Sequence, residues 1–267
     1  MSARAMLVLL GHHWQLHRRP LVPMAAALGL FQYILTQFAP APNEATWMTS
    51  MVAMMPPQLR ALAGGDLALA STDGFLALGY AHPFVTLMLS TWAIRLSSAS
   101  LAGEIGRGTM DVLAARPVSR TDHVLAAALA IAFGLLVVVL AAWTGTVIGL
   151  NGRSLGVSAW PFLRVAMSAW LLFMTWGAVG LFVSALHRES GTAIAWTSAI
   201  IAVSFVLEYL ARLWKTIAAL RPLSLFAYYQ PPDIARSGLA LSSALPMVAV
   251  GVVMMVAAIV VFRRRDL

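Results

Sequence analysis

The chain has 267 residues, of which 60% are hydrophobic and 10% charged, and its mean hydropathy is +0.82. Soluble domains are nearer half apolar and a quarter charged, so this composition excludes an ordinary soluble enzyme and indicates a membrane protein. Apolar residues occur along the whole chain, so we expect a single transmembrane domain over 1–267. Cysteine is absent, which excludes disulfides and Cys-ligated zinc or iron–sulfur centres.

The first 19 residues mix apolar and basic side chains. Apolar residues recur at helical spacing at Met6, Leu7, Leu10 and Trp14, with histidines and arginines among them. This pattern predicts an amphipathic helix over 1–19 that lies in the membrane interface. The histidines allow a metal or proton site, because imidazole is the commonest metal ligand. A helix face that is merely polar explains the same pattern.

Six segments are long and apolar enough to cross a hydrocarbon core of about 30 Å, which takes about 20 helical residues. Every peptide group inside lipid must be hydrogen-bonded within its own segment, so these segments are predicted to be helices and not strands. The expected fold class is therefore all-α, a polytopic membrane protein. The predicted spans are 21–39, 81–102, 124–150, 161–185, 191–210 and 244–262.

Basic residues beside the spans set the predicted orientation, because cytoplasmic loops carry more of them. With an even number of spans, both termini fall on the more basic side, and we expect them in the cytoplasm. The net charge of +8 then indicates anchoring to anionic lipid headgroups, and no soluble basic domain points to nucleic acid. The more basic side carries Arg4, Arg18, Arg19, Arg107, Arg116, Arg120, Arg188, Arg263, Arg264 and Arg265, and the other carries Arg60, Arg153, Arg164, Arg212, Lys215, Arg221 and Arg236.

The loop over 103–122, between the second and third spans, carries helix signals of its own. Thr109 can cap a short helix that has Asp111 in its first turn. Pro117 should end this helix, since the residue before a proline is pushed out of the helical region. We therefore expect a short amphipathic helix below the membrane, which is suited to receiving force from a soluble partner.

A second start signal follows for the third span. Ser119 or Thr121 can cap that long helix, because either hydroxyl can accept a hydrogen bond from a free backbone N–H. Asp122 then falls in the first turn, where the helix dipole stabilises a negative charge.

At these residues the chain resembles the type-2 ABC permeases, in which a loop of the form Glu-x3-Gly-Thr-(Leu/Met)-(Glu/Asp)-x-Leu-x3-Pro-(Val/Ile/Leu)-(Ser/Thr)-Arg follows the second of six spans. The segments 59–66, 222–231 and 262–267 are similar to the family as well. Many members carry a second acidic residue or a lysine before the Gly-Thr pair, whereas this chain has Gly106 and Arg107. The matching residues are Glu104, Gly108, Thr109, Asp111, Leu113, Pro117, Ser119 and Arg120.

The resemblance implies an exporter or a related ATP-driven transporter, built from two six-helix permeases and two nucleotide-binding subunits. The second permease would be an identical copy or a paralogue, and a periplasmic accessory protein would be a further partner. The resemblance also implies that residues 104–120, Arg116 included, couple the permease to the ATPase. ATP and Mg would bind to the partner, which leaves this chain without a cofactor or a catalytic residue.

The sequence itself agrees that no ATP site is encoded here. A phosphate-binding loop needs Gly-x4-Gly-Lys-(Ser/Thr), and Lys215, the only lysine, lacks the required glycines. The spans contain few charges, which favours a hydrophobic or amphipathic cargo such as a lipid, a peptide, a drug or an antibiotic. The resemblance places the transport pathway between two protomers, along the first, second and fifth spans.

Two features inside the spans are notable. Arg95 lies in the second span, where a charge costs about 2.5–3.5 kcal/mol at the bilayer centre, so it is a candidate intramembrane polar site facing protein, a cavity or the headgroups. Gly145 and Gly149 in the third span allow close helix approach, either within the chain or at a dimer seam.

The segment before the second span contains Met48, Met51, Met54 and Met55 at helical spacing. Their thioethers are soft ligands that suit Cu(I), so one alternative function is a membrane subunit that serves copper cofactor maturation. An interfacial helix with an apolar face explains the same spacing without metal. A second alternative, an intramembrane enzyme, would need several convergent titratable groups, and Arg95 alone does not supply them.

The segment 211–240 carries prolines among aromatic residues between the last two spans. This composition predicts short, partly re-entrant helices on the external side, whose broken backbone must be buried in protein or reach water. Glu208, near the outer end of the fifth span, precedes Arg212 and Lys215 at helical spacing, and both are predicted to neutralise it.

Overall fold

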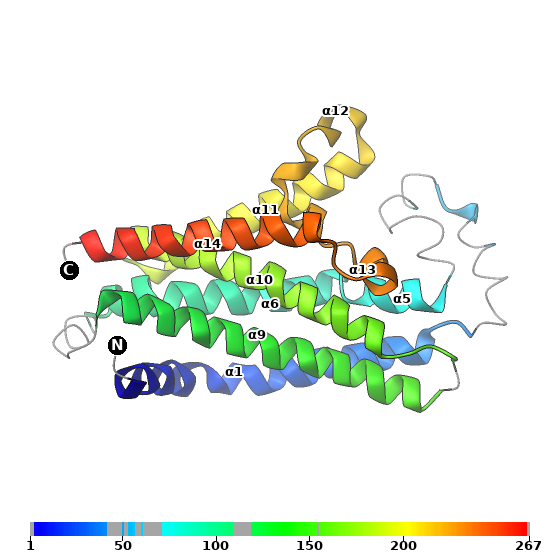
Figure 1. Ribbon diagram of the computed structural model, residues 1–267, viewed down its shortest axis with the longest axis horizontal. Helices are drawn as coiled ribbons and strands as arrows, with labels where there is room; N and C mark the ends of the chain where they lie inside the picture. Colours follow the sequence, from blue (N-terminus) through cyan, green and yellow to red (C-terminus); the bar gives the residue numbers. More distant parts are fainter. Residues whose placement is uncertain are drawn as a thin grey trace.

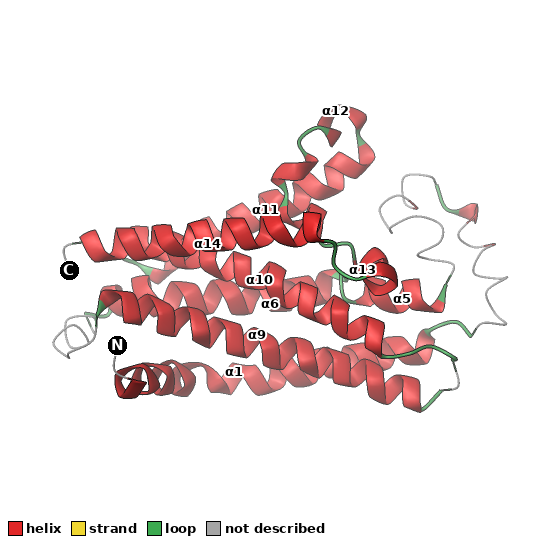
Figure 2. Cartoon of the chain, viewed as in Figure 1, coloured by secondary structure: helices red, strands yellow, loops and turns green. Residues whose placement is uncertain are grey.

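The computed structural model describes residues 3–41, 50, 53–56, 60, 71–108, 119–153 and 155–265. Within these ranges the chain forms helices joined by turns and contains no strand (Figure 2). Six helical segments are long and apolar enough to cross a membrane, and each overlaps one predicted span, which confirms the six-span, all-α fold. They are Arg18–Phe38, Thr72–Gly106, Arg120–Asn151, Trp160–Leu186, Ser190–Leu213 and Leu241–Arg264.

The first span belongs to a longer helix, α1, which runs from Ala3 to Phe38 through Pro20 and Pro23. In Figure 1 the first turns of α1 lie at an angle to the rest, as expected where prolines interrupt the helical hydrogen bonds. Leu9 in these turns is buried against Ala126 of the third span. The predicted N-terminal helix therefore exists as an extension of the first span, and its place in the membrane interface stays a prediction.

The second span is a composite of helical pieces. Ser71 caps the first piece, and the His82 Nδ1 atom accepts a hydrogen bond of 3.2 Å from the Phe84 N–H at the start of the second. Pro83 occupies the first turn of that second piece, where its missing N–H costs nothing. In order, the pieces are α5 (Thr72–Gly79), α6 (Pro83–Ser98), the π-helical η2 (Ala99–Gly103) and α7 (Glu104–Gly106).

Single continuous helices form the other four spans. The last two are joined by short helices in place of one loop, which agrees with the prediction for 211–240, while their re-entrant placement stays a prediction. The long helices are α9 (Arg120–Asn151), α10 (Trp160–Leu186), α11 (Ser190–Leu213) and α14 (Leu241–Arg264), and the short ones are α12 (Lys215–Ala218), η3 (Arg221–Leu223), η4 (Leu225–Tyr228) and α13 (Pro231–Ser237).

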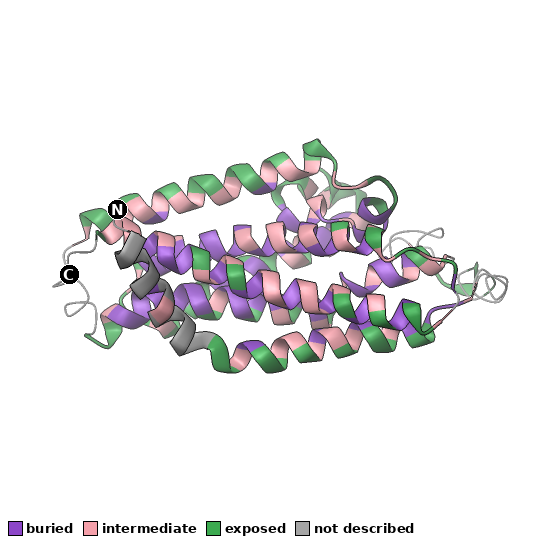
Figure 3. Ribbon diagram, turned by 60° about the horizontal axis from the view of Figure 1, so that its bottom comes forward, coloured by how far each residue is buried: buried purple, intermediate pink, exposed green. Residues whose placement is uncertain are grey.

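The centre of the bundle is α10, which packs against α6, α9, α11 and α14. Figure 3 shows buried residues concentrated on the central helices and exposed residues along the outer faces. Most of the buried side chains are apolar, and Phe162, Leu172 and Phe173 of α10 are fully buried. Because α1, α11 and α14 each expose most of one side, these three spans carry the surface that lipid or another subunit covers.

The contact between α1 and α9 depends on small residues. A Cβ atom on Gly145 would lie 1.9 Å from the backbone oxygen of Gly29, and one on Gly149 would lie 1.7 Å from Oγ1 of Thr36. Neither position has room for a side chain, so both glycines serve close packing within one chain. At the far end of this pair, Arg153 Nη1 donates to the carbonyl oxygens of Thr36 and Gln37 at 2.8 Å.

Candidate functional site

The end of the bundle that carries the loop between α7 and α9, which we call the loop end, is built around the π-helical segment η2. A π-turn leaves backbone groups without their usual helical partners and often marks a functional site. Here the Ala102 N–H donates to Ser184 Oγ at 2.9 Å, and that hydroxyl lies 3.4 Å from the Ser98 carbonyl oxygen. Ser184 belongs to α10, so the end of the second span is bonded directly to the centre of the bundle.

Beyond η2, the predicted coupling residue Glu104 is 3% exposed. Its Oε1 atom lies 2.9 Å from Nη2 of Arg107, whose side chain is 54% exposed. A buried carboxylate needs such a partner, because an unpaired charge out of water is very costly. Gly108 follows with a φ of 68°, a left-handed conformation that glycine adopts without strain. The loop motif therefore needs a glycine at position 108, because the chain turns there in a left-handed conformation.

The turn is held close to the start of α11. A Cβ atom on Gly106 would lie 2.9 Å from the Arg188 carbonyl oxygen, so α7 touches the backbone between α10 and α11 at this point. The lack of a side chain at Gly106 permits this approach.

The loop returns to the bundle at Ser119, which caps α9. Ser119 Oγ accepts a hydrogen bond of 3.1 Å from the Asp122 N–H, and the Asp122 carboxylate accepts one of 3.4 Å from the Ser119 N–H. This capping box satisfies two backbone donors that the helix start leaves free. Of the two caps that the sequence allowed, the structure has Ser119.

Arg120, the last residue of the loop motif, points to the end of α14. Its Nη1 atom donates to the carbonyl oxygens of Phe262 at 3.4 Å and Arg263 at 3.2 Å, and also to that of Arg265. These carbonyls have no partners within α14 and form the negative end of its dipole, which a guanidinium stabilises. Arg120 therefore fastens the start of α9 to the end of the last span.

A second arginine continues this connection to α10. Arg265 Nη1 donates to the carbonyl oxygens of Ala185 at 2.7 Å and His187 at 2.8 Å. Partial burial lowers the pKa of Arg265, and the nearby charge of Arg188 lowers it further. The base of the loop is thus a continuous set of contacts that joins η2, α9, α10 and α14.

Four predicted coupling residues, Glu104, Gly108, Ser119 and Arg120, lie at this base. Ser184 and Arg265 belong to the same set. No local sequence pattern indicates Ser184, and charge counting treats Arg265 only as part of a basic C-terminus. The other predicted coupling residues lie outside the described residues: Thr109, Asp111, Leu113, Arg116 and Pro117.

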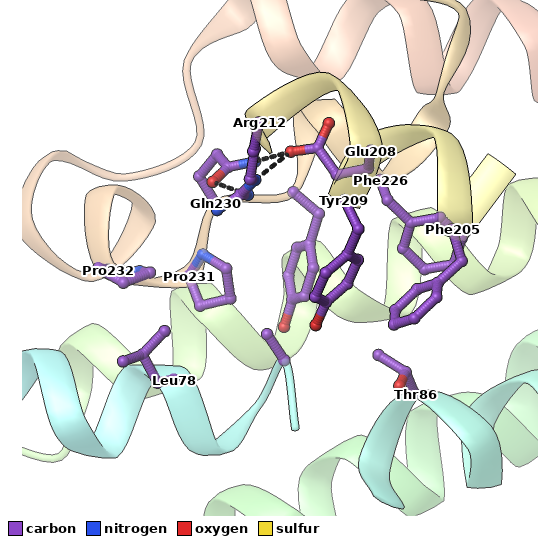
Figure 4. Close-up of a pocket in the computed structure, with 12 residues that line it drawn as sticks. Leu78, Thr86, Phe205, Glu208, Tyr209, Arg212, Phe226, Gln230, Pro231 and Pro232 are labelled. Carbon is purple, nitrogen blue, oxygen red and sulfur yellow. Dashed lines mark hydrogen bonds and ion pairs between the residues drawn. The ribbon is translucent and has the colours of Figure 1, made fainter. Parts of the chain in front are cut away.

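At the opposite end, Glu208 of α11 organises the segment 214–240, which we call the cap. Its Oε1 atom lies 2.7 Å from Arg212 Nε and 3.0 Å from Arg221 Nη2. Gln230 joins the network by accepting a hydrogen bond of 2.6 Å from Arg212 (Figure 4). Arg221 takes the place predicted for Lys215, which is exposed, because the chain folds back after α12.

Below this network lies a small pocket of about 70 Å³ whose walls include Leu78, Phe205 and Tyr209 (Figure 4). Tyr229 also lies in the wall of this pocket, and its hydroxyl donates a hydrogen bond of 3.4 Å to the Tyr80 carbonyl oxygen. Burial raises the pKa of Tyr229 well above its usual value, with a smaller contribution from Tyr80. The hydroxyl therefore stays protonated, and the pocket joins the cap to the end of the second span that lies opposite the loop end.

A larger hollow of about 690 Å³ opens between α10, α11 and α14. Its lining is almost entirely apolar, with Ser204 as one of the few polar contributors, and residues of η3 and η4 close one end. Because the three helices are membrane spans, this hollow faces the lipid region and suits an aliphatic or aromatic group. Its walls include Trp176, Phe182, Ile200, Val203, Val250 and Met254.

The methionine prediction lies mostly outside the described residues. Met48 and Met51 are not described, whereas Met54 is 86% exposed and Met55 36% exposed. Among the described residues, no group of three or more His, Asp or Glu side chains could hold a metal ion.

The six apolar helices define a multi-pass membrane protein. At one end of its bundle, the base of a loop is bonded to the helical elements η2, α9, α10 and α14. Residues 20–267 match the model of the ABC-2 family transporter proteins. The chain belongs to this family and is the membrane component of a transporter, which confirms the resemblance inferred from the loop. Membership implies an ATP-binding subunit as a partner. No curated protein matches the sequence.

Proposed function

We propose that this chain is the permease subunit of an ATP-driven exporter that moves a hydrophobic or amphipathic substrate across a bacterial inner membrane. Two permease subunits, identical or paralogous, associate with two nucleotide-binding subunits that bind ATP and Mg. The termini and the loop end face the cytoplasm, and the cap faces outward. The chain itself contributes no catalytic residue.

The bonded base of the loop is the observation that carries this proposal. A force applied to the loop between Gly108 and Ser119 reaches α14 through Arg120 and α10 through Arg265. It reaches α10 by a second route through η2 and Ser184. An ordinary solvated turn needs neither route, whereas a loop that receives mechanical work from a partner needs both of its ends fastened to the spans.

The apolar hollow between α10, α11 and α14 supports the substrate class. A pocket of this size with little polar lining binds by burial of apolar surface and selects weakly by hydrogen bonding. A lipid, an apolar peptide or an amphipathic drug fits that chemistry better than a sugar or a free ion does.

The test uses the complex with the ATPase subunit, which is identified by co-purification with the permease, reconstituted in lipid nanodiscs. ATP hydrolysis and its stimulation by candidate substrates are measured for wild type, Glu104→Ala and Arg120→Ala. We expect both variants to co-purify with the ATPase and to lose stimulation severalfold, because Arg120→Ala removes the bonds to α14 and Glu104→Ala removes the ion pair that holds the turn after η2. Arg263→Ala is the matched control, since it removes an equal charge from the same end while its carbonyl stays available to Arg120.

Unchanged stimulated turnover in both variants would refute the coupling assignment. ATP hydrolysis by the purified permease alone would refute the larger proposal. Thermal unfolding of each variant, followed by tryptophan fluorescence, separates loss of coupling from loss of fold.

A further inference from the structure

One face of α6 presents a charge to the outside of the bundle. Leu87, Thr91 and Arg95 lie four residues apart, so they share a helix face, and all three are exposed. The opposite face, with Leu89 and Ala93, is completely buried in the core. The Arg95 side chain forms no hydrogen bond or ion pair with any other residue that the structure describes.

Arg95 also lies near the middle of the segment that runs from α6 to α7 in the second span. At a rise of 1.5 Å per residue it is about 18 Å from Pro83, at the start of α6, and about 16 Å from Gly106, at the end of α7. Long basic side chains escape lipid by extending to the headgroups from positions near helix ends, and Arg95 is far from both ends. Lipid tails alone are therefore a poor cover for this face, and we expect it to lie next to a cavity or an anionic group in the assembled transporter.

A second copy of this chain cannot provide that anion. Glu104 and Glu208, the carboxylates closest to the spans' interior, are buried and already paired with arginines. The others lie at or beyond the span ends, so a homodimer would bring a second Arg95 to the cavity without bringing a counter-charge. The full set of carboxylates is Glu44, Asp66, Asp73, Glu104, Asp111, Asp122, Glu189, Glu208, Asp233 and Asp266.

We propose that Arg95 binds the anionic group of an amphipathic ligand inside the transport pathway. The guanidinium presents paired N–H donors whose geometry matches a phosphate, sulfate or carboxylate. Thr91 does not compete as a donor, because its hydroxyl already donates to the Leu87 carbonyl oxygen at 2.8 Å. Leu87, further along the same face, contacts the apolar part of the ligand. This inference rests on the proposed permease function and narrows its substrate to anionic amphiphiles.

The test measures binding to the purified full-length permease in the neutral detergent dodecyl maltoside, without the ATPase. The probe is ³²P-labelled dodecyl phosphate, and the competitors are unlabelled dodecyl phosphate, dodecyl phosphocholine and inorganic phosphate. We expect Arg95→Ala to weaken binding of the probe by about tenfold or more, since hydrogen bonds to a charged group are lost. Arg95→Lys should keep part of the affinity, because it retains the charge and loses the paired geometry.

Arg19→Ala is the matched control, because Arg19 is an exposed cation close to the end of a span. We expect Arg19→Ala to bind labelled dodecyl phosphate with the affinity of wild type. Dodecyl phosphocholine should compete poorly with the probe. Unchanged binding in Arg95→Ala, or an equal loss in Arg19→Ala, would overturn the site. Inorganic phosphate that competes as well as unlabelled dodecyl phosphate would overturn the amphipathic ligand. Because no ATPase is present, this result is independent of the coupling experiment.

Discussion

Replacing Gly145 by alanine tests the packing on which the position of the first span depends. The added Cβ would lie 1.9 Å from the Gly29 backbone oxygen, whereas real Cβ contacts are essentially never shorter than 3.0 Å. The two helices must therefore separate by about 1 Å, because neither atom can rotate away. Overpacking costs about 3 kcal/mol at the upper end of its usual range, and alanine recovers about 1 kcal/mol in helix propensity. We expect a net loss of about 2 kcal/mol.

Thermal unfolding of the detergent-solubilised protein, followed by the fluorescence of its nine tryptophans, measures this loss. Gly191→Ala is the control, because a Cβ at Gly191 meets no atom within 4 Å and alanine favours the helix. The control should unfold at the wild-type temperature or slightly above it. A Gly145→Ala protein that unfolds no earlier than wild type would show that α1 does not depend on this contact.

Two further substitutions test the two ends of the bundle. Glu208→Ala leaves Arg212 and Arg221 without their carboxylate. Because the side chains of these arginines are 20% and 40% exposed, we expect the free energy of unfolding to fall by about 1–3 kcal/mol, which is less than the usual cost of breaking a fully buried pair. Faster amide hydrogen exchange in the cap, with no change at the loop end, would confirm that Glu208 stabilises the cap. An equal increase in exchange at both ends of the bundle would contradict this role. Ser119→Ala removes the cap of α9 and should cost about 1 kcal/mol in thermal unfolding, while Ser119→Asp should cost little because aspartate also caps. Equal stability of the two variants would rule out the capping role.

The six spans could be predicted because every segment that crosses lipid must form all its backbone hydrogen bonds within itself. The helix start at Ser119 was predictable for a similar reason, since capping depends on local residue types. The composition of the second span was not predictable. Its π-turn depends on Ser184, which is 82 residues away from Ala102, and no local pattern indicates that contact.

The ion pairs show the same limit. Glu208 and Arg212 lie one helical turn apart, so their pairing followed from the sequence. Lys215 was the wrong second partner, because helical spacing stops being informative once α11 ends at Leu213. Arg221 reaches Glu208 only after the chain reverses, and chain reversals depend on tertiary contacts.

Arginines that bind backbone carbonyls recur at both ends of the bundle and give the loop a defined mechanical context. Arg153 holds the end of α1 to α9, Arg120 holds the end of α14 to α9, and Arg265 holds α14 to α10. Each satisfies carbonyls that a helix end cannot satisfy itself. When basic residues beside the spans are counted to predict orientation, these arginines are treated as free surface charges. Such a count does not reveal that they bind backbone carbonyls.

These contacts connect α1, α9, α10 and α14, whereas the arginines of α11 and η3 bind Glu208 of α11 itself. A displacement of the loop is therefore expected to move the connected helices together and to change their position relative to α11. The apolar hollow lies between α11 on one side and α10 and α14 on the other, so the same displacement changes its width. The helix α6, which carries Arg95 on its exposed face, also packs against α11. Motion of α11 relative to the connected helices would thus act on both the apolar hollow and α6.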